Sequence, residues 1–128
     1  MTAANDRVLV LEADDAGHPP LPIVEGEGSA HAIIWPGMGA ALRSLHMITL
    51  ESGARTIDMR HQGEAVYFVR DGVATVQDHD AGEAHEVAAG RMFFVEPATR
   101  YAIHAADGRC QLVGGPSPPD LTLYEGLA

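Results

Sequence analysis

Short apolar runs recur along the chain at intervals of about eight to twelve residues, and residues that favour turns separate them. No segment keeps the 3.6-residue period of an amphipathic helix for long. The pattern therefore predicts a chain that is nearly all β. The predicted strands span residues 7–11, 30–35, 42–51, 55–61, 65–70, 73–78, 84–88, 91–96, 100–105 and 109–114.

Three short segments between predicted strands have the composition of hairpin turns. They are Asp71-Gly72, residues 80–82 and Asp107-Gly108. Asp and Gly tolerate the positive φ angles that tight turns require. We therefore expect each of the three to reverse the chain between neighbouring strands.

The length of 128 residues is that of a single domain with one hydrophobic core. Proline-rich runs at residues 18–22 and 116–119 flank the predicted strands, and proline cannot donate to a sheet ladder. The sequence thus predicts one domain over residues 1–128, with its core at about residues 30–114. Residues 1–29 and 115–128 are expected to form arms over this core.

Composition excludes several classes of function. The 18 acidic residues outnumber 8 basic ones, for a net charge of −10, so nucleic acid would be repelled. Every basic residue is arginine, which removes lysine Schiff-base chemistry. The charged N-terminus and the absence of a long apolar run predict a cytoplasmic protein without a membrane span. The single cysteine, Cys110, excludes an internal disulfide.

The strand alternation predicts which side chains point inward. In residues 55–61, Ile57, Met59 and His61 share one face, which is the apolar one. Further along, Tyr101 and Ile103 share a face. We therefore expect His61 and Tyr101 to be inward-facing polar groups.

Two glycine-bounded segments, residues 53–72 and 90–105, resemble the two sequence motifs of the cupin superfamily. The first runs from Gly53 through His61 to Gly72, and the second from Gly90 through Pro97. The resemblance implies an all-β, single-domain, jelly-roll-like barrel of two antiparallel sheets. Aligned on the glycines, the metal-ligand positions of the superfamily fall on Met59, His61, Ala65 and Tyr101. Only His61 keeps the usual type of residue.

A narrower resemblance, to ectoine synthase-like cupins, rests on three short runs. They are residues 37–39 (Gly-Met-Gly), 64–67 (Glu-Ala-Val-Tyr) and 90–92 (Gly-Arg-Met). In that family the Glu of the second run is an iron ligand together with a Tyr and a His. The matching positions here hold Glu64, Phe93 and Tyr101, so the ligand set is not reproduced.

For two predicted strands the sequence allows either face to point into the barrel. Aligned on Gly72, Tyr67 points inward and Glu64 outward, whereas alignment on Glu64 gives the reverse. A β-bulge would let both side chains reach the cavity. Residues 42–51 are apolar on both faces, so His46 points inward in one register and outward in the other.

These residues support a small-molecule enzyme with acid–base chemistry, namely a lyase, cyclase or isomerase of a biosynthetic pathway rather than a dioxygenase. His61 is the expected base, Tyr101 the acid or oxyanion donor and Glu64 the orienting group. The residues expected to contact the substrate line the same predicted barrel. They are Trp35, Met59, Tyr67, Phe94 and Ile103.

Two alternatives accompany this hypothesis. In the first, a rearranged set of His46, His61, Glu64 and Tyr101 binds one divalent metal ion, which would be Fe, Zn, Mn or Ni. In the second, no cofactor is present and the barrel is a non-catalytic module that binds a small ligand. In each case the open sheet edges favour a homodimer.

Overall fold

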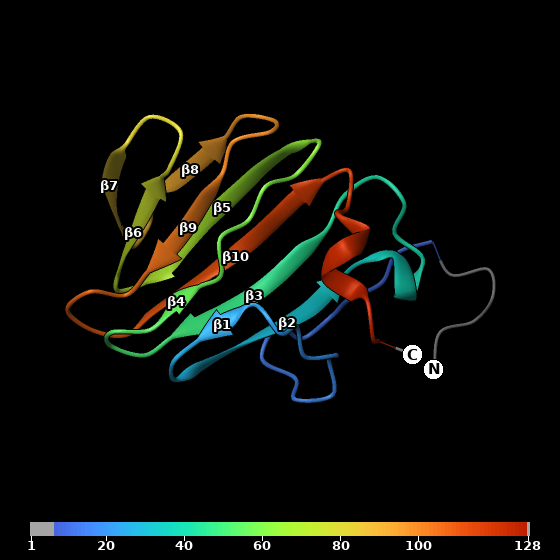
Figure 1. Cartoon of the computed structure of the whole chain (residues 1–128). Coiled ribbons are helices and arrows are strands. Elements are labelled where there is room, and N and C mark those ends of the chain that lie inside the picture. Colours follow the sequence, from blue (N-terminus) through green and yellow to red (C-terminus); the bar gives the residue numbers. More distant parts are fainter. Residues whose placement is uncertain (1–6, 128) are drawn as a thin grey trace.

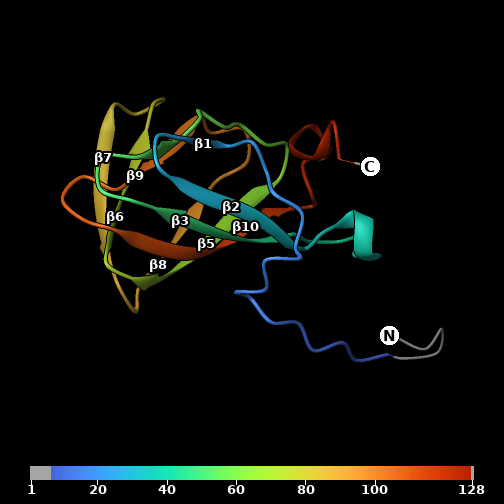
Figure 2. The same ribbon diagram turned by 90° about the horizontal axis from the view of Figure 1, so that it is seen from below.

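Two five-stranded antiparallel sheets pack face to face in the computed structural model, which describes residues 7–127 (Figure 1). The first sheet has the strand order β2-β3-β10-β5-β8, and the second β1-β4-β9-β6-β7. Viewed from below, the sheets enclose the space between them (Figure 2). The strands are β1 (Val24–Glu25), β2 (Gly28–Ile34), β3 (Leu45–Leu50), β4 (Arg55–Thr56), β5 (Glu64–Asp71), β6 (Val73–Asp78), β7 (Glu83–Ala88), β8 (Met92–Val95), β9 (Tyr101–His104) and β10 (Cys110–Ser117).

Within the described residues 7–127 the helical content is limited to two short 3₁₀ helices, η1 (Pro36–Met38) and η2 (Leu121–Tyr124). The predicted all-β class and the two-sheet barrel are therefore confirmed. No helix within residues 7–127 has the length and apolar character needed to cross a membrane.

Two predicted strands are wrong in whole or in part. Residues 7–11 form no strand and pair with none of the strands within residues 7–127, and Val10 is 95% exposed. In residues 55–61 only β4 is a strand. Met59 still exchanges two backbone hydrogen bonds with Tyr101, of 2.7 and 2.9 Å, which leads the chain across the barrel end to His61.

Only one of the three expected hairpin turns joins two paired strands, and it is residues 80–82 between β6 and β7. Asp71-Gly72 connects β5 to β6, and Asp107-Gly108 connects β9 to β10, so both cross from one sheet to the other. Gly72 has a φ of 73°, and a Cβ there would lie 2.2 Å from the carbonyl oxygen of Arg109. Asp-Gly favours a turn with a positive φ angle. The same turn can lead to a strand of the same sheet or to a strand of the other sheet, so Asp-Gly alone does not predict a hairpin.

Side chains on the inner faces of the two sheets form the core, and β5 shows the alternation most clearly. On β5, Ala65, Tyr67 and Val69 are buried between exposed neighbours. Ile48 and Leu112 of the same sheet are fully buried, as each inward side chain meets the opposite sheet. Burial of each such aliphatic side chain contributes roughly 1.5–3 kcal/mol. This alternation fixes which polar side chains enter the barrel.

The predicted arms are partly incorporated into the barrel. β1 and the start of β2 lie within the expected N-terminal arm, and β10 extends to Ser117 within the C-terminal one. Residues 118–127 then turn back and place η2 across one end of the barrel (Figure 1). Leu123 and Tyr124 of η2 are buried there. Residues 1–6 and 128 of the predicted arms lie outside the described residues.

Candidate functional site

A continuous chain of hydrogen bonds joins four side chains in the barrel. The Nδ1 atom of His61 lies 2.7 Å from Oδ2 of Asp120. The Nε2 atom of the same ring lies 2.8 Å from the hydroxyl of Tyr101. The hydroxyls of Tyr101 and Tyr67 are 2.7 Å apart. The order of the chain is therefore Asp120, His61, Tyr101 and Tyr67.

Each member of this chain comes from a different part of the fold. Tyr67 and Tyr101 are inner-face residues of β5 and β9, which lie in opposite sheets. His61 follows the Met59 bridge to Tyr101, which brings its ring to the same level of the barrel. Asp120 is the N-cap of η2, and its Oδ1 accepts hydrogen bonds from the backbone and hydroxyl of Thr122. The cap leaves Oδ2 free for His61.

The charge on Asp120 sets the direction of the hydrogen bonds. Burial acts to raise the pKa of Asp120, but hydrogen bonds from Thr122 and His61 hold it below its ordinary value. An ionised carboxylate can only accept, so the Nδ1–H of a neutral His61 donates to it. Nε2 then accepts from the Tyr101 hydroxyl, and the Tyr101 oxygen accepts from Tyr67.

Both phenols in the chain are held in their neutral form. Burial raises the pKa of Tyr101 well above its ordinary value, and the neighbouring Tyr67 raises it further. Burial likewise raises the pKa of Tyr67 to about 12. Each hydroxyl therefore carries a proton at neutral pH, and the pair can act as donors or as a relay.

A second buried histidine lies beside this chain. His46 points inward from β3, and its Nε2 lies 2.7 Å from the hydroxyl of Tyr124 on η2. Burial, aided by the charge of nearby His61, lowers the pKa of His46 to about 4. Trp35 packs against Tyr124, with ring centroids 5.1 Å apart. η2 thus supplies a partner to each of the two inward histidines.

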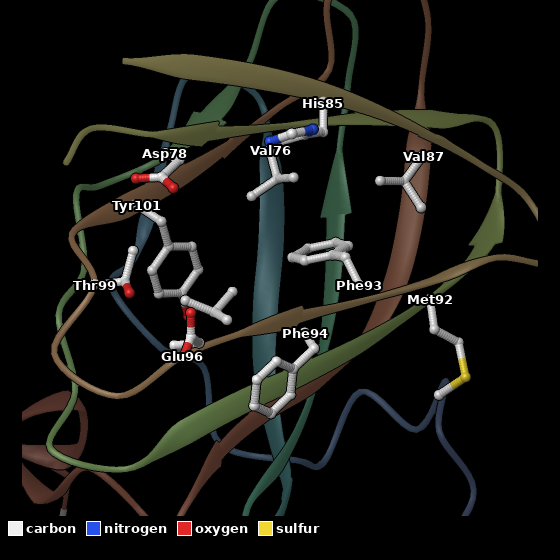
Figure 3. A pocket seen from close by; sticks show the side chains of 11 residues that line it. Val76, Asp78, His85, Val87, Met92, Phe93, Phe94, Glu96, Thr99 and Tyr101 are labelled. Atoms are coloured by element: carbon white, nitrogen blue, oxygen red, sulfur yellow. The ribbon is translucent and has the colours of Figure 1, made fainter. Parts of the chain in front are cut away.

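A cavity of about 390 Å³ opens between β6, β7, β8 and β9 (Figure 3). Its walls combine valine, methionine and aromatic side chains with the polar side chains of Asp78, His85, Glu96 and Thr99. Tyr101 also lines it and is 1% exposed. Tyr101 is the one residue that belongs both to the cavity wall and to the hydrogen-bonded chain.

The structure brings several of the predicted site residues together. His61, Tyr67 and Tyr101 are bonded in one chain, and His46 faces inward, which decides both registers that the sequence left open. Met59 and Ile103 are buried in the core, but neither lines the cavity. Trp35 contacts η2 rather than the cavity.

Two residues assigned to the site from the sequence, Glu64 and Phe94, differ in where the structure places them. Glu64 is exposed on the outer face of β5, because the alternation that buries Ala65 and Tyr67 turns it outward. It therefore meets neither His61 nor Tyr101. Phe94 lines the cavity, as expected, but is 56% exposed, whereas Phe93 lines it from the other side of β8 and stacks on Tyr67 with centroids 5.1 Å apart. Figure 3 shows the two phenylalanines on opposite sides of β8.

The donor set does not fit a divalent metal ion. Of the proposed ligands, Glu64 lies outside the barrel, and both nitrogens of His61 are already hydrogen-bonded. Within residues 7–127, no three His, Cys, Asp or Glu side chains come together in a way that could hold a metal. Met59 fills a position where the superfamily has a ligand, and its thioether is a poor donor to hard divalent ions.

Sequence reasoning missed Asp120 and Tyr124. Both were assigned to an arm, since a proline-rich stretch precedes them. The available signal was Asp120 followed two residues later by Thr122, which is typical of a helix N-cap. That signal predicts a short helical turn, although it does not predict where the turn docks.

Two facing antiparallel sheets around an inward polar chain define a small jelly-roll barrel of the cupin class. The Cupin domain model matches residues 46–113, which is more than half of the chain. The chain therefore belongs to the cupin family.

Solved structures with this fold share little sequence with the chain. A cupin-like protein from Thermotoga maritima is 17% identical over 92% of this chain and 84% of its own, with a TM-score of 0.67. The polyketide cyclase RemF from Streptomyces resistomycificus is 21% identical over 89% and 82%, with a TM-score of 0.62. KdgF from a Halomonas species is 16% identical over 78% and 88%, with a TM-score of 0.63. These likenesses show the fold alone. No curated protein matches the sequence significantly.

Proposed function

We propose that this cupin is a small-molecule enzyme that moves protons by acid–base catalysis, as an isomerase, cyclase or lyase would. One observation carries the proposal, namely that Tyr101 joins the cavity to the chain that ends at Asp120. A substrate in the cavity thus lies against the side chain of Tyr101, whose hydroxyl is backed by a histidine and a carboxylate. That arrangement is suited to removing a proton and returning it.

The hydrogen bonds along the chain can point in either of two directions. The two states differ by one proton on His61. With neutral His61, the Tyr101 hydroxyl donates to Nε2, and Tyr67 donates to Tyr101. With protonated His61, Nε2–H donates to Tyr101, and the Tyr101 hydroxyl is free to donate to Tyr67 or to a substrate. The reversal needs only rotation of hydroxyl hydrogens, since the heavy atoms keep their places.

A balanced reaction follows from this reversal. The substrate gives a proton to the Tyr101 oxygen while Tyr101 passes its own proton to His61, and an imidazolium forms beside the carboxylate of Asp120. In the second half, Tyr101 donates to another atom of the substrate while His61 returns its proton to Tyr101. Donation to carbon gives isomerisation, and donation to a leaving hydroxyl releases water. His61 is therefore the base, and Asp120 is its positioning residue.

The neighbouring structures are consistent with such chemistry. RemF is a polyketide cyclase, and ring closure by elimination of water is one outcome of the same two proton transfers. The metal-dependent alternative lacks a suitable ligand set within residues 7–127, and the cavity beside Tyr101 supports the acid–base proposal instead. The expected homodimer and cytoplasmic location stay predictions.

The proposal can be tested without knowing the physiological substrate. We expect the protein to speed the exchange of enolisable C–H protons of small ketones with deuterium in D₂O, as measured by NMR. Tyr101→Phe and His61→Asn should each reduce the exchange rate by about a hundredfold or more. His79→Asn is the matched control, because His79 forms its hydrogen bond with Asp58, away from the cavity.

Circular dichroism and thermal unfolding would establish that each variant is folded. Exchange at the wild-type rate in folded Tyr101→Phe would contradict the proposal. An equal loss of exchange in His79→Asn would also count against the proposal, because the exchange rate would then not depend specifically on the hydrogen-bonded chain from Asp120 to Tyr67.

A further inference from the structure

The charges and walls of the cavity restrict what can bind there. We infer that the substrate is a small, flat, largely apolar molecule that is neutral or cationic and carries no carboxylate or phosphate. This inference rests on the proposed function, since it takes the Tyr101 cavity to be the place of reaction. Three features of the cavity support it, namely its apolar wall, its acidic polar groups and its size.

Aliphatic and aromatic side chains form the deep wall of the cavity. Val76, Val87 and Val95 are each less than a tenth exposed. Phe93 points into the space between them (Figure 3), held by its stacking on Tyr67 with an interplanar angle of 24°. A fixed aromatic ring beside branched aliphatic side chains favours a planar, apolar ligand.

The charged groups of the cavity are acidic. Asp78 and Glu96 contribute carboxylates, while the other polar side chains are His85 and Thr99. Oδ1 of Asp78 accepts hydrogen bonds from the backbone amides of Asp80 and Ala81, which holds this carboxylate in place. No arginine is among the residues that line the cavity. An anionic ligand would therefore meet two like charges with no cation to pair with.

Arg60 and Arg100 do not line the cavity, and both are paired with aspartates. Arg100 comes directly after Thr99 in the chain, but its guanidinium binds Asp58 at 2.7 Å. Arg60 binds Asp80 at 3.4 Å. Both point to the outer surface, where they are half-exposed. They do not supply the bidentate contact by which arginine recognises carboxylate or phosphate.

The volume of about 390 Å³ is at the small end of the ~300–1,000 Å³ typical of ligand sites. A compact ring system fits this space. The carbonyl or hydroxyl that reacts would lie against Tyr101, and a polar or cationic substituent would lie toward Asp78 and Glu96.

Three aryl ketones that differ in charge test the inference. They are acetophenone, 4-(aminomethyl)acetophenone and 4-acetylbenzoate, and binding at low salt is followed by NMR chemical-shift changes. We expect the neutral and cationic ketones to bind about tenfold or more tightly than the carboxylate. In Asp78→Asn/Glu96→Gln this preference should fall to within about threefold, while the control Glu27→Gln/Asp107→Asn, with the same loss of charge, keeps it.

Tyr101→Phe separates this inference from the proposed function. This variant keeps the ring in the wall and removes the hydroxyl, so the charge preference in binding should persist without exchange. Equal or tighter binding of 4-acetylbenzoate, or binding of none of the three ketones, would overturn the inference. If the preference appears but wild type and Tyr101→Phe exchange protons equally, the proposed function fails and the binding preference stands.

Discussion

His61 bonds through its Nδ1 atom, at 2.7 Å, to the carboxylate of Asp120, which lies 59 residues later in the chain. The side chain of His61 is 2% exposed and that of Asp120 14% exposed. This contact makes the C-terminal segment part of the site. The segment closes one end of the barrel and also fixes the tautomer of the histidine that Tyr101 meets.

Asp120→Asn should remove the carboxylate that fixes the tautomer and orientation of the His61 ring. An asparagine has a neutral amide that can either donate or accept, so His61 would lose its preference for the Nδ1–H tautomer. We expect the exchange of ketone protons to fall by about a hundredfold or more. Nitrogen-15 NMR of the imidazole should show a mixture of tautomers where the wild type shows one. Asp14→Asn, which changes an exposed carboxylate bonded to Arg70, is the control and should leave both readouts unchanged. An unchanged tautomer in Asp120→Asn would refute the positioning role.

Removal of the Tyr101 hydroxyl should cost more stability than removal of the Tyr67 hydroxyl. Tyr101→Phe leaves both Nε2 of His61 and the hydroxyl of Tyr67 without their partner in a buried place. We expect a loss of about 2–3 kcal/mol in the free energy of unfolding, against about 1 kcal/mol for Tyr67→Phe. Urea unfolding of the two single variants and the double variant gives a coupling energy. Additive losses would mean that the hydroxyls do not interact.

The parts of the site that follow strand alternation were predictable, and those set by docking of distant segments were not. His61 and Tyr101 could be placed inward because residues 55–61 and β9 both carry apolar side chains at a period of two residues, although only the first two residues of 55–61 form a strand. Glu64 could not be placed, because β5 carries apolar residues on both faces. Val66 and Phe68 of its outer face are more than a third exposed, so the hydropathy of that strand does not mark the inner side.

The two residues that sequence reasoning missed are placed by tertiary contacts. Nothing local to Asp120 or Tyr124 indicates that η2 turns back over the barrel, since residues 118–127 contain no long apolar run. The contacts of η2 with His61 and His46 span 59 and 78 residues. Spacing between neighbouring residues carries no information about such contacts. The glycine spacings, in contrast, predicted the family fold correctly.

His46 should make stability depend on pH between about 4 and 6.5. Burial lowers the pKa of His46 to about 4 in the folded protein, from its ordinary value of 6.5. Between these values the unfolded chain binds a proton that the folded protein does not, so the free energy of unfolding falls as the pH falls through this window. This loss of unfolding free energy reaches about 3 kcal/mol near pH 4 and is absent above pH 6.5.

Urea unfolding at several pH values, with His46→Gln as the reference, measures this contribution. Glutamine keeps a hydrogen-bonding group near Tyr124 but does not titrate. The difference in unfolding free energy between wild type and variant should therefore shrink toward low pH. Parallel pH profiles for the two proteins would show that His46 is not the group responsible.

Gly114 provides the space in which two site residues lie side by side. On β10 it is the cross-strand partner of both His46 and Tyr67. A Cβ at this position would lie 2.1 Å from the carbonyl oxygen of Val66 and 2.7 Å from the ring of Tyr67. Gly114→Ala should therefore force β10 from β5 and lower the free energy of unfolding by about 2 kcal/mol or more. Gly17→Ala is the control, because its nearest neighbour is the flexible carboxylate of Asp15 at 3.3 Å. If both variants unfold at the wild-type urea midpoint, β10 does not need a glycine to hold these two side chains together.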